Sequence, residues 1–116
     1  MSHQASMTAE MRECIRNCQE CYAECMETVQ HCLTMGGKHA GKDHISTLLA
    51  CAAICQASAT AMLVGSKHHH ETCRACAVIC KACEKECRDM GQGDDTMMQC
   101  AEACAACARS CQKMAA

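Results

Sequence analysis

The hydrophobic and polar positions of this chain repeat with the period of an α-helix over most of its length. The stretch CRACAVICKACEKEC, residues 73–87, places its cysteines three, four, three and four residues apart. Alternating gaps of three and four put side chains on one face of a helix, as at the core-facing positions of helical bundles. A strand would alternate at every second residue, and that pattern is missing. The spacing predicts a helix whose buried face is lined by thiols.

Glycines divide this periodic sequence into segments. Helices often end at glycine because it tolerates the left-handed conformation, and Asp43, Ser66 and Asp94 or Asp95 are the expected N-caps of the segments that follow. The breaks at Gly36, Gly37, Gly41, Gly65, Gly91 and Gly93 leave the segments 7–35, 43–64, 67–90 and 95–114. Four segments of this length with short connections predict an all-α protein. The expected fold is an antiparallel up-down-up-down four-helix bundle formed by one domain, residues 1–116.

The gaps of three and four continue through all four segments, and every cysteine of the chain lies on one of the four stripes that they define. Ile15, Tyr22, Val29, Ile54 and Ile79 flank the stripes. The expected core is therefore lined by cysteine. The 16 positions are Cys14, Cys18, Cys21, Cys25, Cys32, Cys51, Cys55, Cys73, Cys76, Cys80, Cys83, Cys87, Cys100, Cys104, Cys107 and Cys111.

Composition narrows the class of protein. The chain has 16 Cys, 10 Met and 7 His but a single aromatic residue, so large apolar side chains cannot fill the core. The net charge of −2 indicates neither a nucleic-acid partner nor a cationic one. The first residues, MSHQASMTAEMREC, lack the pattern of a secretion signal, and we expect no membrane-spanning segment. We expect a cytoplasmic protein with reduced thiols.

Three other roles for the cysteines fit this pattern poorly: simple packing, disulfides within a helix, and iron–sulfur ligation. Cysteine packs as a small apolar side chain, but a core made mostly of cysteine is thin. Cβ atoms three or four residues apart on a helix are about 5–6 Å apart, whereas a disulfide needs about 3.5–4.5 Å. Disulfides between helices are sterically possible, but the expected cytosolic setting disfavours them. The proline-terminated cysteine run of bacterial ferredoxins is absent, and the chain has no proline.

Metal binding is a role that accounts for every thiol on the four stripes. Four thiolates hold Zn(II) with a net charge of about −2, and several such sites in one narrow core would bury several negative charges. One Cu(I) for each thiolate leaves the core near neutrality, and soft sulfur ligands select Cu(I). The residues favour a store of multiple Cu(I) ions. A metallothionein-like buffer for Zn(II), Cd(II) or Ag(I) is the alternative, and a thiol redox protein is a third possibility.

Four cysteine-rich runs identify a family. The chain resembles the bacterial copper storage proteins, and without a signal peptide it resembles their cytosolic branch. The resemblance implies a four-helix bundle filled with many Cu(I) ions, a storage function without catalytic residues, and a homotetramer. The runs are CIRNCQECYAEC, CAAIC, CRACAVICKACEKEC and CAEACAACARSC.

The up-down-up-down order collects softer ligands at each end of the bundle. We expect Met35, His44, Met90 and Met97 to be further metal ligands at one end, close to His39, because the resemblance implies that copper enters through an end lined by Met and His. Methionine also fills gaps in cores. The opposite end carries Met7, Met11, Met62, His68, His69, His70 and Met114. No nucleophile, base and orienting group stand apart from the stripes, so we do not expect an enzyme.

Overall fold

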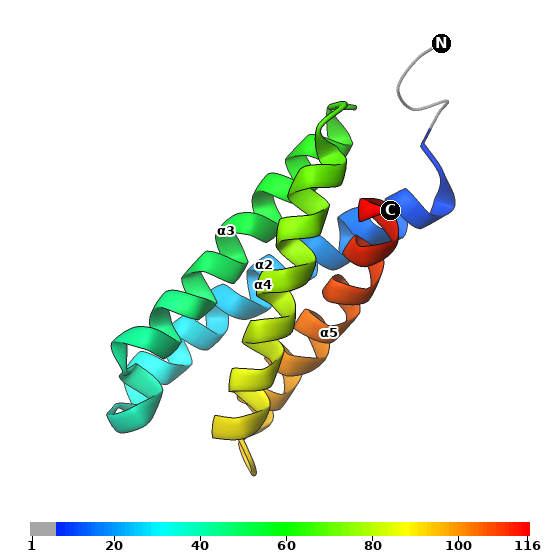
Figure 1. The fold of residues 1–116 in the computed structure, drawn as a ribbon. Helices are drawn as coiled ribbons and strands as arrows, with labels where there is room; N and C mark the ends of the chain where they lie inside the picture. The colour runs from blue at the N-terminus through cyan, green and yellow to red at the C-terminus, as the bar shows by residue number, and fades with distance from the viewer. Residues whose placement is uncertain (1–6) are drawn as a thin grey trace.

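The computed structural model describes residues 7–116, and within that range it contains four α-helices and one short 3₁₀ helix (Figure 1). Each helix runs antiparallel to the next, and α2 packs against α5 as well as α3, which closes the bundle. The predicted up-down-up-down bundle is confirmed; residues 1–6 of the expected domain lie outside the described range. The elements are α2 (Ala9–Met35), η1 (Gly37–Ala40), α3 (Lys42–Leu63), α4 (His69–Met90) and α5 (Asp95–Ala115).

The core of the bundle is made of the cysteine stripes. All 16 cysteines are free thiols with 0% exposure. Leu48, Met62 and Met97 are equally buried, and Ile15 is 6% exposed. The prediction that every cysteine faces one core is therefore confirmed. The bundle measures 52 × 21 × 20 Å, so this core is a narrow column along the long axis.

The structure confirms the expected N-cap of one helix and corrects those of two others. Asp94 caps α5 as expected, since its side chain accepts a hydrogen bond from the Met97 backbone N–H. The expected caps Asp43 and Ser66 are wrong. Helix α3 starts one residue before Asp43, because η1 brings the chain into position at Gly41. Helix α4 starts at His69, and Ser66 instead accepts from the His68 N–H in the preceding turn.

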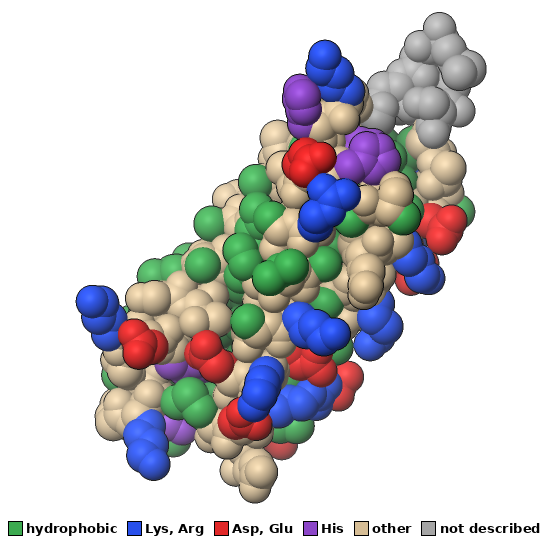
Figure 2. All heavy atoms as spheres, in the orientation of Figure 1, with side chains coloured by type: hydrophobic (Ala, Val, Ile, Leu, Met, Phe, Trp, Pro, Cys, Tyr) green, Lys and Arg blue, Asp and Glu red, His purple; other side chains and the backbone are tan. Residues whose placement is uncertain are grey.

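Helix α3 is the apolar member of the bundle. It is the one helix within residues 7–116 long and apolar enough to cross a membrane by length and composition, with a mean hydropathy of 1.5 over its best window and 39% of that window buried. The expectation that no segment reaches this length and hydropathy is thus wrong, because Ala, Leu and Cys fill α3. Figure 2 shows hydrophobic side chains gathered over α3, whereas charged side chains concentrate over α4 and α5.

Candidate metal centre

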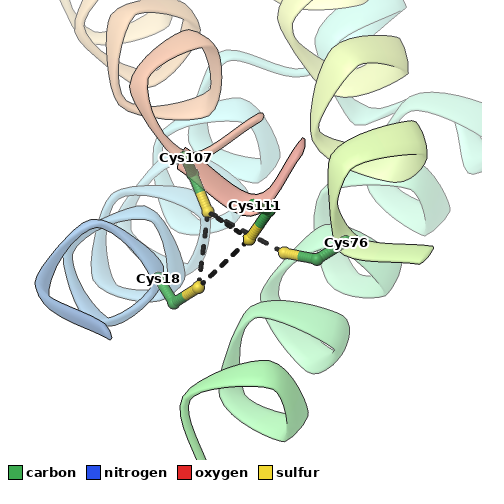
Figure 3. A group of neighbouring side chains, drawn as sticks. All are labelled: Cys18, Cys76, Cys107 and Cys111. Carbon is green, nitrogen blue, oxygen red and sulfur yellow. Dashed lines mark hydrogen bonds between the residues drawn. The ribbon is translucent and has the colours of Figure 1, made fainter. Parts of the chain in front are cut away.

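The sulfur atoms of the core lie close enough together to share ions. Neighbouring Sγ atoms on different helices are 3.5 Å apart for Cys51 and Cys80, and 3.5 Å apart for Cys18 and Cys111. Figure 3 shows Cys18 from α2, Cys76 from α4 and Cys107 and Cys111 from α5 pointing toward one point between the helices. Their four Sγ atoms all lie within 4.8 Å of one another. Such a group can hold a soft metal ion.

Groups of four thiols follow one another along the axis and share members. Because each shared thiolate can bridge two ions, the groups form one continuous ladder of sites. They include Cys18, Cys76, Cys107 and Cys111; Cys21, Cys25, Cys51 and Cys104; Cys21, Cys51, Cys55 and Cys80; Cys25, Cys83, Cys100 and Cys104; and Cys55, Cys76, Cys80 and Cys107.

The remaining thiols extend this ladder at its two ends. Cys14 Sγ is 3.6 Å from Cys111 Sγ, and Cys73 Sγ is 3.3 Å from the Ser58 hydroxyl. Cys87 interacts with Cys100 and Cys83. We call the fifteen cysteines other than Cys32 the thiol column. It runs through almost the whole length of the bundle.

Most of the metal-free thiols resist ionisation. Hydrogen bonds with neighbouring thiols, first that with Cys100, and burial hold the pKa of Cys104 far above its ordinary value. Burial is the largest cause that raises the pKa of Cys32, which reaches about 11. A thiolate deep in a protein is disfavoured unless a cation neutralises it. Thiols of this kind are therefore protonated without metal, and an ion that binds them has to displace their protons.

Geometry alone does not select the metal. A tetrahedral Zn(II) site with Zn–S bonds of about 2.3 Å has S–S edges of about 3.8 Å, which is close to the 3.5–4.0 Å separations in the column. Charge does discriminate. Divalent ions in four-thiolate sites leave a negative charge at every level of a fully buried column, whereas one monovalent ion per thiolate leaves none. Soft sulfur ligands also favour Cu(I).

Two residues that are not ligands interrupt the stripes near one end. Thr28 and Leu48 occupy stripe positions and are both completely buried. The Thr28 hydroxyl donates to the Glu24 carbonyl at 2.7 Å, so it remains tied to its own helix. Beyond them on α2, Cys32 is separated from the other cysteines of that helix.

Cys32 is surrounded by a different set of ligands. Its Sγ lies 3.4 Å from Met97 Sδ, 3.5 Å from His44 Nε2 and 3.8 Å from His39 Nδ1. We call these four residues the Cys32 cluster. They come from α2, α5, α3 and η1, so the cluster forms only when the bundle closes. One thiol, one thioether and two imidazoles make it a mixed site for a soft metal ion.

Of the four predicted Met and His ligands, His44 and Met97 lie in the Cys32 cluster. Met97 packs against Gly91, where a Cβ would come 2.3 Å from Met97 Cβ, so the α4–α5 turn holds it in place. Met90 is half-buried and lines a surface hollow with His44 and Glu86. Met35 is 57% exposed and lies at the C-terminal end of α2. The structure therefore brings two of the four to the thiol.

Spacing could not identify all members of this site. His39 is expected near this end from the sequence but lies off the helical repeat, in the GKHA turn of η1. The helical repeat indicates neither Glu86 nor His31. Glu86 hydrogen-bonds His44, and His31 Nε2 lies 2.8 Å from Asp94 Oδ2. In the sequence, Glu86 lies beside the stripe, one residue before Cys87. Residues at such positions commonly pack between neighbouring helices, so this position alone does not indicate a role at a metal site.

The opposite end of the bundle is built differently. Met62 is completely buried there, and Met7, Met11 and Met114 are half-buried. Its histidines hydrogen-bond the main chain: His69 Nδ1 lies 2.9 Å from the Ser66 carbonyl and His70 Nδ1 lies 2.8 Å from the Met114 carbonyl. At this end two histidines are tied to main-chain carbonyls, whereas at the other end His39 and His44 contact a thiol.

Known proteins share this arrangement. The family model described as copper storage protein matches residues 7–116. A protein of solved structure from Nitrosospira multiformis is 41% identical, with a TM-score of 0.85 over 91% of this chain and 94% of that one. No curated relative matches the chain.

Two further similar structures contain copper by their descriptions. The Cu(I)-bound copper storage protein BsCsp3 is 36% identical, with a TM-score of 0.83 over 92% of this chain and 99% of that one. A cytosolic copper storage protein from Streptomyces lividans, described with five coppers, is 28% identical, with a TM-score of 0.84 over 91% and 92% of the two chains. With its closed bundle and buried thiol column, the chain belongs to the copper storage protein family.

Proposed function

We propose that this protein stores Cu(I) in its thiol column, with roughly one ion per cysteine by charge balance. The observation that carries this proposal is the ladder of fully buried four-thiol groups that share members. Shared thiolates allow many ions to occupy one narrow core without a net buried charge. The Cu(I)-bound BsCsp3 supports the choice of ion. Storage requires no catalytic group, and we propose that the protein is not an enzyme.

We further propose that copper is taken up through the Cys32 cluster. It lies at one end of the core, under the hollow lined by His44, Glu86 and Met90. A thioether and an imidazole hold Cu(I) less firmly than a pair of thiolates, so an ion can move on into the column. Met35 and Met90 are proposed as outer contacts because they are more exposed than Met97.

Anaerobic titration with Cu(I) against a high-affinity chelator tests storage. We expect on the order of one tightly held Cu(I) per cysteine, with all thiols consumed at saturation. A parallel titration with Zn(II) should retain few ions after chelator challenge, because of the buried charge. Saturation with Cu(I) at only a few ions, or retention of Zn(II) in comparable number, would favour the metallothionein-like alternative.

Location and assembly are also proposals. The similar Streptomyces lividans protein is described as cytosolic, which supports a cytoplasmic location here. Residues 44–66 on and after α3 carry no Asp, Glu, Lys or Arg, and Leu49, Leu63 and Val64 are 44%, 48% and 68% exposed. An exposed apolar helix face of this kind supports a homo-oligomer, and we propose the tetramer that the family resemblance implies. Analytical ultracentrifugation of the metal-free and loaded chain tests it.

A further inference from the structure

We infer that Glu86 is a positioning residue for copper uptake, because it holds the His44 ring so that Nε2 faces the Cys32 thiol. The inference rests on the proposed function, in which the Cys32 cluster receives copper before the thiol column. Glu86 lies on α4 and His44 on α3. The contact between them therefore also fixes the ring relative to two helices.

The hydrogen bonds of Glu86 define the orientation of the ring. Glu86 Oε1 lies 3.0 Å from His44 Nδ1. A carboxylate only accepts hydrogen bonds, so His44 Nδ1 carries a proton and donates it. In the neutral ring Nε2 then holds a lone pair, and this atom lies 3.5 Å from Cys32 Sγ. The carboxylate thus selects the tautomer whose ligand atom faces the cluster.

Thr47 holds the carboxylate from its other side. Its hydroxyl lies 2.9 Å from Glu86 Oε2 and 3.0 Å from the Asp43 carbonyl. The hydroxyl has one proton for these two acceptors, and the charged carboxylate is the stronger of them. With one oxygen on His44 and the other on Thr47, Glu86 has little freedom to rotate away.

Burial explains why the ring depends on this partner. His44 is 4% exposed, whereas the Glu86 side chain is 36% exposed at the rim of the bundle. Water has little access to the His44 ring, so an unpaired Nδ1–H would leave a buried donor without an acceptor. Histidines that bind metals generally donate their second ring N–H to a carboxylate or carbonyl, and loss of that partner typically lowers affinity or activity about 10–100-fold. Glu86 has the geometry of such a partner.

The test compares Glu86→Ala and Glu86→Gln with Glu84→Ala in the full-length chain. Glu84 is a matched control on the same helix, because its carboxylate also has a hydrogen-bonded partner, Arg88 Nε at 2.9 Å, which belongs to no proposed metal site. Nitrogen-15 NMR of the His44 ring in the metal-free protein reports the tautomer. Stopped-flow mixing with a Cu(I)–bicinchoninate complex reports the rate of uptake, and chelator titration reports total capacity.

We expect Glu86→Ala to shift His44 toward the Nε2–H tautomer and to slow uptake roughly tenfold, with unchanged capacity. Glu86→Gln keeps an oxygen that can accept the same Nδ1–H, so it should retain much of the wild-type tautomer and rate. Glu84→Ala should match the wild type in all three measurements.

An unchanged tautomer in Glu86→Ala would overturn the inference, and so would a changed tautomer with a wild-type rate. If Glu86→Ala fails to fold by circular dichroism, Thr47→Val serves instead, because it leaves the carboxylate but removes one of its bonds; wild-type uptake in that variant would overturn the inference. A failure of the proposed storage function is distinguishable from a failure of this inference, because it would appear in the chelator titration of the wild-type protein as a capacity of only a few ions.

Discussion

The thiol column and the Cys32 cluster belong to one core but are built on different principles. The column repeats a single ligand type, and most of its Sγ atoms contact other thiols of the same column. The cluster combines three ligand types within 3.8 Å of one sulfur, and charged residues at the rim, Glu86 and Asp94, support it. Repetition suits a site that holds many equivalent ions. A positioned set of weaker ligands suits a site through which ions pass.

The difference also concerns the metal-free state. Column thiols are buried, and each is too small to fill the core as Leu does. Bound copper therefore fills space that apolar side chains leave empty, in addition to binding the thiols. The cluster is complete without metal, because its side chains already bond one another and the bundle rim. We therefore expect the column to control capacity and stability, and the cluster to control rates.

The largest expected effect comes from removing one level of the column. Replacing Cys21, Cys51, Cys55 and Cys80 with serine should lower Cu(I) capacity by roughly four ions, since oxygen is a poor ligand for Cu(I). Anaerobic chelator titration measures the loss. The matching set of alanine substitutions is the control for the added hydroxyls, and it should lose the same number. Full capacity in both variants would show that the ions do not lie in the column.

Copper in the column should also stabilise the fold. Ions that bind only the folded chain add about 2.7 kcal/mol when free ligand reaches one hundred times its dissociation constant. For a chain of this size that raises the melting temperature by roughly 10 °C or more. Thermal unfolding followed by circular dichroism under anaerobic conditions checks this. An unchanged melting temperature after verified loading would contradict the claim that copper fills the core.

Loading should release protons in proportion to the copper bound. The pKa of Cys32 is about 11 and that of Cys104 lies far above its ordinary value, so these thiols are protonated at neutral pH. Each protonated thiol therefore gives up its proton when it binds Cu(I) as a thiolate, and binding weakens as the pH falls. A pH indicator in weakly buffered solution should report about one proton per Cu(I). Uptake without proton release would mean that the thiols are already ionised.

The sequence was sufficient to predict the column but only part of the cluster. A strict repeat of three and four residues places every cysteine on an inward face, and the helix period alone then brings Cys18, Cys76, Cys107 and Cys111 together. The cluster depends on contacts that no period encodes. His39 reaches Cys32 from a 3₁₀ turn, and Met35, although on the stripe, lies past the last packed turn and is 57% exposed. End positions depend on loop geometry, which spacing does not determine.

Changing the cluster should affect rate and spare capacity. His44→Ala with Met97→Leu should slow both uptake from a Cu(I) chelator complex and removal by excess chelator, by roughly tenfold. The control is Met35→Leu with Met90→Leu at the same end, which should have a smaller effect because these side chains are more exposed. Stopped-flow absorbance measures both directions. Equal rates in all variants would show that the Cys32 cluster does not control how fast ions enter and leave the thiol column.

The smallest expected effect tests how the rim supports the cluster. Asp94 accepts from the Met97 N–H at 3.1 Å, and His31, which donates to its other oxygen at 2.8 Å, is the largest cause that lowers the pKa of Asp94. A carboxylate whose pKa is lower in the folded chain than its unfolded value of about 3.9 adds stability above that value, and the contribution is lost as the pH falls further.

Asp94→Asn keeps a capping side chain but removes the charge. We expect the metal-free variant to be less stable by about 1 kcal/mol near neutral pH, and the difference to shrink below about pH 4. Urea unfolding of both chains from about pH 3 to pH 7 measures it. A difference that stays constant across this range would mean that the charge of Asp94 does not contribute to the stability of the folded chain.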